Sequence, residues 1–156
     1  TQPDRFLNDA RTAFDYIAGA QASTGVFGYP YNPRGAGLTQ AAARIVEQGQ
    51  AQGLTMVENG WVIEDLGDGG LQFDNGVVGA GLLYAYAVTK HEPYLESAKR
   101  AGTWAATRPL VLNWNYNCFS GQLLARLYRV TGEAHWLAEA KKKFDHGVLP
   151  GQMPNG

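Results

Sequence analysis

The chain has 156 residues, of which 45% are apolar, 12% aromatic and 17% charged, and 20 of them are glycine. This composition is that of one globular domain, residues 1–156, with long ordered loops between its regular elements. The net charge of −1 and the lack of a clustered basic stretch argue against nucleic-acid binding, and no apolar run reaches the ~20 residues of a membrane span.

Apolar residues recur at helical spacing in six segments, and this pattern predicts an all-α fold. The first segment, 4–20, is apolar on one face, and a weaker helix follows at 38–50. The third, 77–89, is apolar on nearly all sides, so we expect it to be buried on every side. It pairs through a tight turn with the one-sided segment 93–106, and 118–131 pairs in the same way with 135–147.

These pairs are similar to each other, which indicates an internal repeat. The pattern aromatic-Leu-x-x-Ala begins at Phe6, Tyr94 and Trp136, and Gly79 aligns with Gly121 in the helices that precede the last two copies. We therefore expect repeated antiparallel helical hairpins, each with a buried inner helix and a one-sided outer helix. The expected inner helices are 38–50, 77–89 and 118–131.

Isolated residues with reactive side chains have ordinary structural interpretations. Cys118 is the only cysteine, so the sequence holds no internal disulfide or cysteine-rich zinc site, and we expect a small buried hydrophobe. No two histidines have the spacing of a helical metal site, and neither a metal nor another cofactor is expected. His91 and His135 fall in short turns, and the run 141–143 of three lysines is expected on the solvent face of a helix.

Three long connections, 24–37, 57–76 and 107–117, each lead into an inner helix. Because the hairpins alternate in direction, we expect these loops at one end of the bundle and the short turns at the other. Loops of this length are usually functional or disordered, and their many aromatic residues favour order. The aromatic residues expected to contact a ligand there are Tyr29, Tyr31, Trp61, Phe73, Trp114 and Tyr116.

The middle loop also holds five of the chain's 14 carboxylates, with no lysine or arginine between them. Rings beside carboxylates suit a sugar-binding cleft, because the rings stack on sugar faces and the acids accept hydrogen bonds from hydroxyls. Cleavage of a glycosidic bond needs two carboxyl groups ~5–9.5 Å apart. Asp68 and Asp74 are the best candidates for these catalytic acids.

Simpler roles for the two acids stay open. Asp74 is expected at the N-cap of the inner helix and could act there alone. Asp68 and the glycines that follow it could form only a turn, or a cation site together with Asp65.

Residues 75–89 and 114–133 resemble the (α/α) toroids of the six-hairpin glycosidase superfamily, through a Val-Thr-Gly-Glu-type turn followed by aromatic-Leu-x-x-Ala. The resemblance covers residues 75–147 and implies a glycoside hydrolase or polysaccharide lyase whose partner is a poly- or oligosaccharide. In a lyase, Tyr116, Asn115 and Tyr29 would carry the chemistry in place of the two aspartates. The alternative is a non-catalytic helical-repeat module that binds glycan or protein, or an assembly subunit.

A complete toroid needs more hairpins than the roughly three in this sequence, so a partial (α/α) toroid is expected. Residues 147–156 look like the lead-in to a further inner helix. The chain would then be part of a longer protein, a ring that closes as a homo-oligomer, or an open bundle. The sequence leaves the cellular compartment open.

Overall fold

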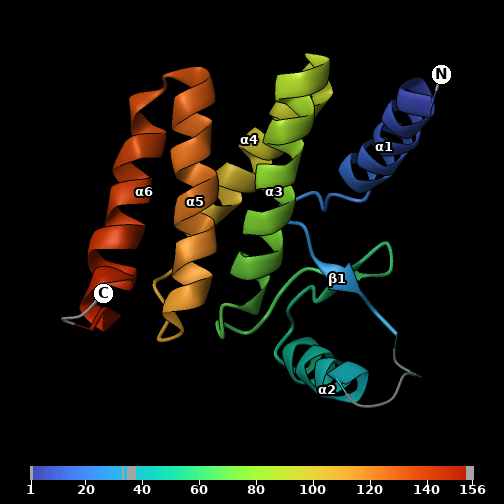
Figure 1. Ribbon diagram of the computed structural model, residues 1–156. Coiled ribbons are helices and arrows are strands. Elements are labelled where there is room, and N and C mark those ends of the chain that lie inside the picture. The colour runs from blue at the N-terminus through green and yellow to red at the C-terminus, as the bar shows by residue number, and fades with distance from the viewer. Residues whose placement is uncertain (1, 33, 35–37, 154–156) are drawn as a thin grey trace.

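The computed structural model describes residues 2–32, 34 and 38–153, with side chains for 5–32, 34 and 41–153 (Figure 1). Within these ranges it holds six α-helices and three short strands. The all-α fold expected from helical periodicity is confirmed. The helices are α1 (Gln2–Gly19), α2 (Leu38–Ala51), α3 (Gly70–Thr89), α4 (Glu92–Thr107), α5 (Trp114–Thr131) and α6 (Ala134–Gly147), followed by the 3-10 turn η1 (Leu149–Gly151).

Two tight hairpins form the centre of the molecule. α3 and α4 are joined through residues 90–91, and α5 and α6 through residues 132–133. Lys90 and Gly132 end the first helix of each hairpin in the left-handed conformation, with φ of 58° and 73°. Each donates its backbone N–H at 2.8 Å to a tyrosine carbonyl one turn back, that of Tyr86 or Tyr128. The two hairpins therefore repeat each other in their caps as well as in their sequence.

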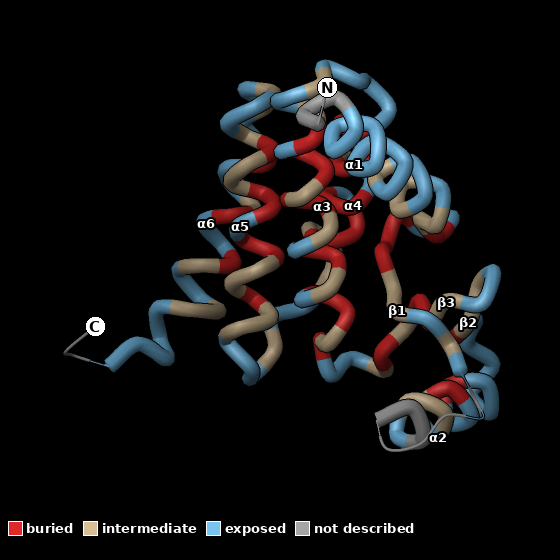
Figure 2. Tube along the Cα trace, turned by 45° about the vertical axis from the view of Figure 1, so that its right-hand side comes forward, coloured by how far each residue is buried: buried red, intermediate tan, exposed pale blue. Residues whose placement is uncertain are grey.

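The main core lies where α3, α4 and α5 pack together, as the buried parts of the trace in Figure 2 show. Glycine allows α3 to approach α5 closely, because a Cβ at Gly76 would lie 2.6 Å from the carbonyl oxygen of Phe119. α1 covers one flank of the hairpins, and its residue Asp15 accepts a 2.7 Å hydrogen bond from the Tyr94 hydroxyl of α4.

The expectation that segment 77–89 is buried on every side is wrong. α3 begins seven residues earlier, at Gly70, and one of its faces carries Val77, Tyr84 and Val88 with exposed fractions of 43%, 58% and 74%. In Figure 1 the helices α3 and α5 stand in front of α4. Periodicity shows that a helix is apolar all round, but it does not show what covers each side.

The expectation of an inner helix at 38–50 is also wrong, although a helix is present there. α2 lies apart from the hairpins (Figure 1) and packs its residue Val46 into a small separate cluster with Met56 and Val62. The two-residue strands β1 (Tyr29–Pro30), β2 (Val57–Glu58) and β3 (Trp61–Val62) form an antiparallel sheet beside it, in the order β1-β3-β2. Strands this short have no alternation that a sequence pattern could reveal.

Candidate functional site

The connections that lead into α3 and α5 meet at the end of the bundle opposite the tight turns (Figure 1). Between them lies a groove of about 540 Å³. One wall is the glycine-rich turn before α3, and the other is the connection between α4 and α5 with the first turn of α5. The lining residues are Gly67, Asp68, Leu110, Val111, Leu112, Asn113 and Tyr116.

The turn before α3 is held by a buried carboxylate. Asp65, 7% exposed, accepts hydrogen bonds of 3.0 Å from the backbone N–H groups of Gly67 and Leu71. It therefore satisfies an N–H of the first helical turn, as a capping side chain does. Gly69 precedes the helix with φ of 86°, and a Cβ there would lie 2.8 Å from Val111 of the opposite wall.

Asp74 is not the N-cap that the sequence suggested, because α3 already begins at Gly70 and Asp74 lies in its second turn. It is half-buried, and burial raises the pKa of its carboxyl group. Asp68 is exposed on the groove and accepts a 2.7 Å hydrogen bond from the backbone N–H of Gly70.

Three acids act electrostatically on the hydroxyl group of Tyr29. Burial, and then the negative charges of Asp68, Asp65 and Asp74, raise the pKa of the Tyr29 hydroxyl. This half-buried tyrosine belongs to β1, far from the acids in sequence. The structure thus brings both predicted acids within electrostatic range of one predicted aromatic residue, Tyr29.

A buried lysine lies beneath the groove. The ammonium group of Lys143, 1% exposed, donates to Gln72 Oε1 at 2.9 Å and to the Arg108 carbonyl at 2.8 Å. Gln72 also accepts from Ser120 Oγ at 3.1 Å and donates to the Pro109 carbonyl at 3.1 Å. These bonds tie α6 to the start of α3 and to the connection that forms the other wall.

The prediction of three lysines on a solvent face is therefore wrong for Lys143, although Lys141 and Lys142 are exposed. The sequence did carry a signal. Lys143 follows Trp136 by seven residues and Ala140 by three, so it shares the buried face of α6. Burial of its amine raises the free energy of the charged form and lowers the pKa of Lys143 to about 8, assisted by the positive charge of Lys142.

A second buried amide fixes the wall between α4 and α5. Asn117, fully buried, donates to the Val111 carbonyl at 2.7 Å and accepts from the Val111 N–H at 3.1 Å. It also donates to the Gly147 carbonyl at 2.8 Å, at the end of α6. The groove wall is thus held by side chains that sequence reasoning did not single out.

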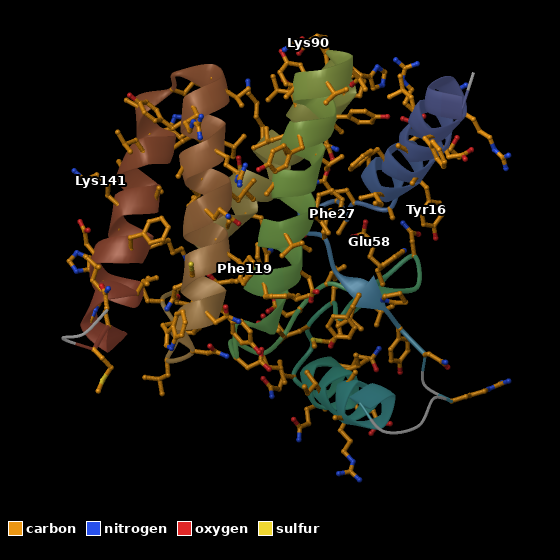
Figure 3. All side chains as sticks on the ribbon, viewed as in Figure 1. Tyr16, Phe27, Glu58, Lys90, Phe119 and Lys141 are labelled. Atoms are coloured by element: carbon orange, nitrogen blue, oxygen red, sulfur yellow. The ribbon has the colours of Figure 1, made fainter. Side chains whose placement is uncertain are left out.

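The predicted aromatic residues divide into two groups. Tyr116 lines the groove, Trp114 is 55% exposed beside it at the start of α5, and Phe73 packs edge-on against Phe119 at 4.5 Å between centroids. Phe119 lies between α3 and α5 in Figure 3. In contrast, Trp61 packs half-buried on the main core and Tyr31 on the small cluster around Val46, so neither lines the groove.

The charge beside the groove is mainly negative. Arg108 is engaged with Glu64, with 3.3 Å between Nη1 and Oε2, and its guanidinium lies 4.4 Å from the centroid of Trp104. In the described ranges no group of His, Cys, Asp and Glu side chains is placed to hold a metal ion. Of the helices that the structure describes, none has the length and apolar character needed to cross a bilayer.

Comparison of the chain with models of protein families, with curated proteins and with solved structures gives no match.

Proposed function

We propose that the chain binds an oligosaccharide in the loop-end groove and cleaves it as a glycoside hydrolase. The observation that carries the proposal is the pair Asp68 and Asp74, which both act electrostatically on Tyr29 but lie in different surroundings, Asp68 exposed on the groove and Asp74 half-buried in the second turn of α3. Glycosidases use two carboxyl groups whose environments separate an acid from a base.

The different surroundings of the two acids support a different proposed role for each. Burial raises the pKa of Asp74, so this residue is proposed as the general acid that protonates the leaving oxygen. Asp68 is exposed on the groove and is proposed as the carboxylate that acts as base or nucleophile. Tyr116, on the opposite side of the groove, supplies a ring on which a sugar face would stack.

The charge of the groove favours a neutral or amino sugar over a uronic acid. Three carboxylates act on Tyr29, and the neighbouring cation Arg108 is already paired with Glu64. A substrate that carries carboxylates would be repelled by these acids. A polysaccharide lyase acts on uronic acids and needs their charge neutralised. The charge of the groove therefore supports a hydrolase better than a lyase.

The test compares Asp68→Asn and Asp74→Asn with the wild type on a panel of end-labelled neutral and amino-sugar oligosaccharides. Asp145→Asn, which alters an exposed acid on α6, is the matched control. We expect Asp68→Asn and Asp74→Asn each to lose cleavage by at least about a hundredfold, as removal of an acid–base group does, while they still bind the glycan in calorimetry. Unchanged turnover in both variants would refute the assignment.

A non-catalytic glycan-binding module is the second candidate, and the exposed apolar rim supports it. Leu112 is fully exposed, with a relative exposure of 104%, and Trp114 is 55% exposed on the same connection. A binding platform needs such side chains, and it does not need the acids. It predicts saturable binding without product, loss of binding in Trp114→Ala, and tolerance of both aspartate substitutions.

A further inference from the structure

The exposed side of α3 carries a continuous apolar stripe. Its four large members have exposed fractions of 36% for Phe73, 43% for Val77, 58% for Tyr84 and 74% for Val88. They lie at helical spacing on the side opposite the core-facing residues such as Leu82. Contiguous apolar residues on the surface of a folded protein indicate an interaction site.

The neighbours of α3 leave the members of this stripe exposed, although the guanidinium of Arg126 on α5 lies 4.5 Å from the centroid of the Tyr84 ring. Phe119 of α5 contacts Phe73 at one edge, and Phe14 of α1 lies 3.9 Å from where a Cβ of Gly81 would be at the other. The two neighbouring helices of the described chain are thus already in place. What is left is a ridge between them that is accessible from outside.

The stripe is symmetric about its centre. Gly81 lies in the middle, Val77 and Tyr84 flank it, and Phe73 and Val88 lie at nearly equal distances beyond. In an antiparallel pair of such helices, Val77 would meet Tyr84 and Phe73 would meet Val88, each twice. Every contact then joins a large side chain to a smaller one.

The charged residues on this face also favour antiparallel pairing. Arg126 and Arg129 of α5, which line a pocket together with Tyr84, give the turn end of this face a positive charge. Asp68 and Asp74 give the loop end a negative charge. An antiparallel pair places the basic end of each copy beside the acidic end of the other, whereas a parallel pair places like charges together.

We propose that a second copy of this chain packs on the exposed face of α3 and α5, antiparallel and related by a two-fold axis that crosses the stripe midway between Val77 and Tyr84. A two-fold interface uses the same surface on both subunits, so a self-complementary stripe is what it requires. Exposed aromatic side chains with flanking arginines are also the composition of protein interfaces. In this dimer, the end of the second copy that carries Arg126 and Arg129 faces the loop end that carries Asp68.

The first test is sedimentation velocity of the 156-residue chain over a range of micromolar concentrations. We expect a dimer, and we expect Val77→Glu and Tyr84→Glu each to weaken self-association by at least about tenfold. Tyr16→Glu on α1, at an aromatic residue that is more exposed than Tyr84 (69% against 58%), is the control and leaves the dimer intact. Circular dichroism of each variant confirms that the helices are retained. A wild-type chain that is monomeric at all these concentrations overturns the proposal.

The second test fixes the orientation by cross-linking. In a Cys118→Ser background, the double variant Val77→Cys/Tyr84→Cys is oxidised and run on a non-reducing gel. A disulfide needs Cα atoms within about 7 Å, so the antiparallel dimer links Cys at 77 to Cys at 84 of the second copy. The single variant Val77→Cys stays unlinked. Linkage in the single variant indicates a parallel pair, and no linkage in the double variant indicates no such contact; either result overturns the proposal.

Discussion

The ammonium group of Lys143 lies 2.9 Å from the side-chain oxygen of Gln72, and each of the two residues is only 1% exposed. Both acceptors of this cation, Gln72 and the Arg108 carbonyl, are neutral. A buried charge held by neutral dipoles retains much of its desolvation cost. The contact therefore connects α6 to both walls of the groove, and it does so with a group whose charge is sensitive to pH.

Lys143→Ala and Lys143→Met separate packing from charge. Alanine leaves a cavity under the groove and is expected to lower the free energy of unfolding by about 2–4 kcal/mol, as large-to-small core changes do. Methionine fills most of the space and removes the buried charge, so at pH 7 the loss is expected to be within about 1 kcal/mol. Urea denaturation measures both, and Lys142→Met at the exposed neighbour is the control, expected within about 0.5 kcal/mol of the wild type. Equal losses for alanine and methionine would show that packing of the Lys143 side chain contributes nothing to the free energy of unfolding.

The stability of the wild type relative to Lys143→Met is expected to rise with pH between about 8 and 10.5. Burial lowers the pKa of Lys143 in the folded chain, so across this window the unfolded chain binds more protons than the folded chain. The free energy of unfolding therefore rises with pH. Below the window both states are charged, and above it both are neutral, so the difference is constant. The charged groups that act on Lys143 are Lys142, Glu139 and Arg108, and they are present in both proteins. Urea denaturation at intervals of half a pH unit measures the difference, and a flat curve would mean that the folded amine keeps its ordinary pKa.

Asp65 is expected to matter for stability and Asp68 for function. Asp65→Ala removes the acceptor for two backbone N–H groups at 3.0 Å and should lower the free energy of unfolding by about 1–2 kcal/mol. Asp68→Ala removes one exposed acceptor and should lower it by less than about 1 kcal/mol. Thermal unfolding followed by circular dichroism compares the two variants. A larger effect of Asp68→Ala would reverse these roles.

Trp61 is expected to matter for stability and Trp114 for glycan binding. Trp61 packs on the main core, so Trp61→Ala should destabilise the fold by more than about 1 kcal/mol. Trp114 is 55% exposed beside the groove, so Trp114→Ala should leave the stability within about 1 kcal/mol of the wild type and weaken glycan binding. Chemical denaturation and binding calorimetry on both variants test this, and normal glycan binding by Trp114→Ala would exclude its ring from the site.

The candidate site was predictable only in part. Asp68, Tyr116 and Trp114 were expected at the loop end because loops before inner helices fall together, and they do lie there. Tyr29 could be expected at the same end, but only the fold placed it within range of Asp68 and Asp74. The buried hydrogen-bonding roles of Lys143 and Asp65 were not expected, because Lys143 was assigned to a solvent face and Asp65 only to a possible cation site. Each acts through hydrogen bonds to groups distant in the chain or to loop backbone, and neither kind of bond leaves a periodic pattern.

By itself, the sequence determined the helices of the two central hairpins. The 3.6-residue period of their apolar residues and the short turns at 90–91 and 132–133 are local properties, so they can be recognised without the fold. The tertiary structure alone decided which apolar surface is covered. Burial depends on which segments pack together. For that reason the local sequence predicted neither the burial of Lys143 nor the exposure of the apolar residues Val77, Tyr84 and Val88.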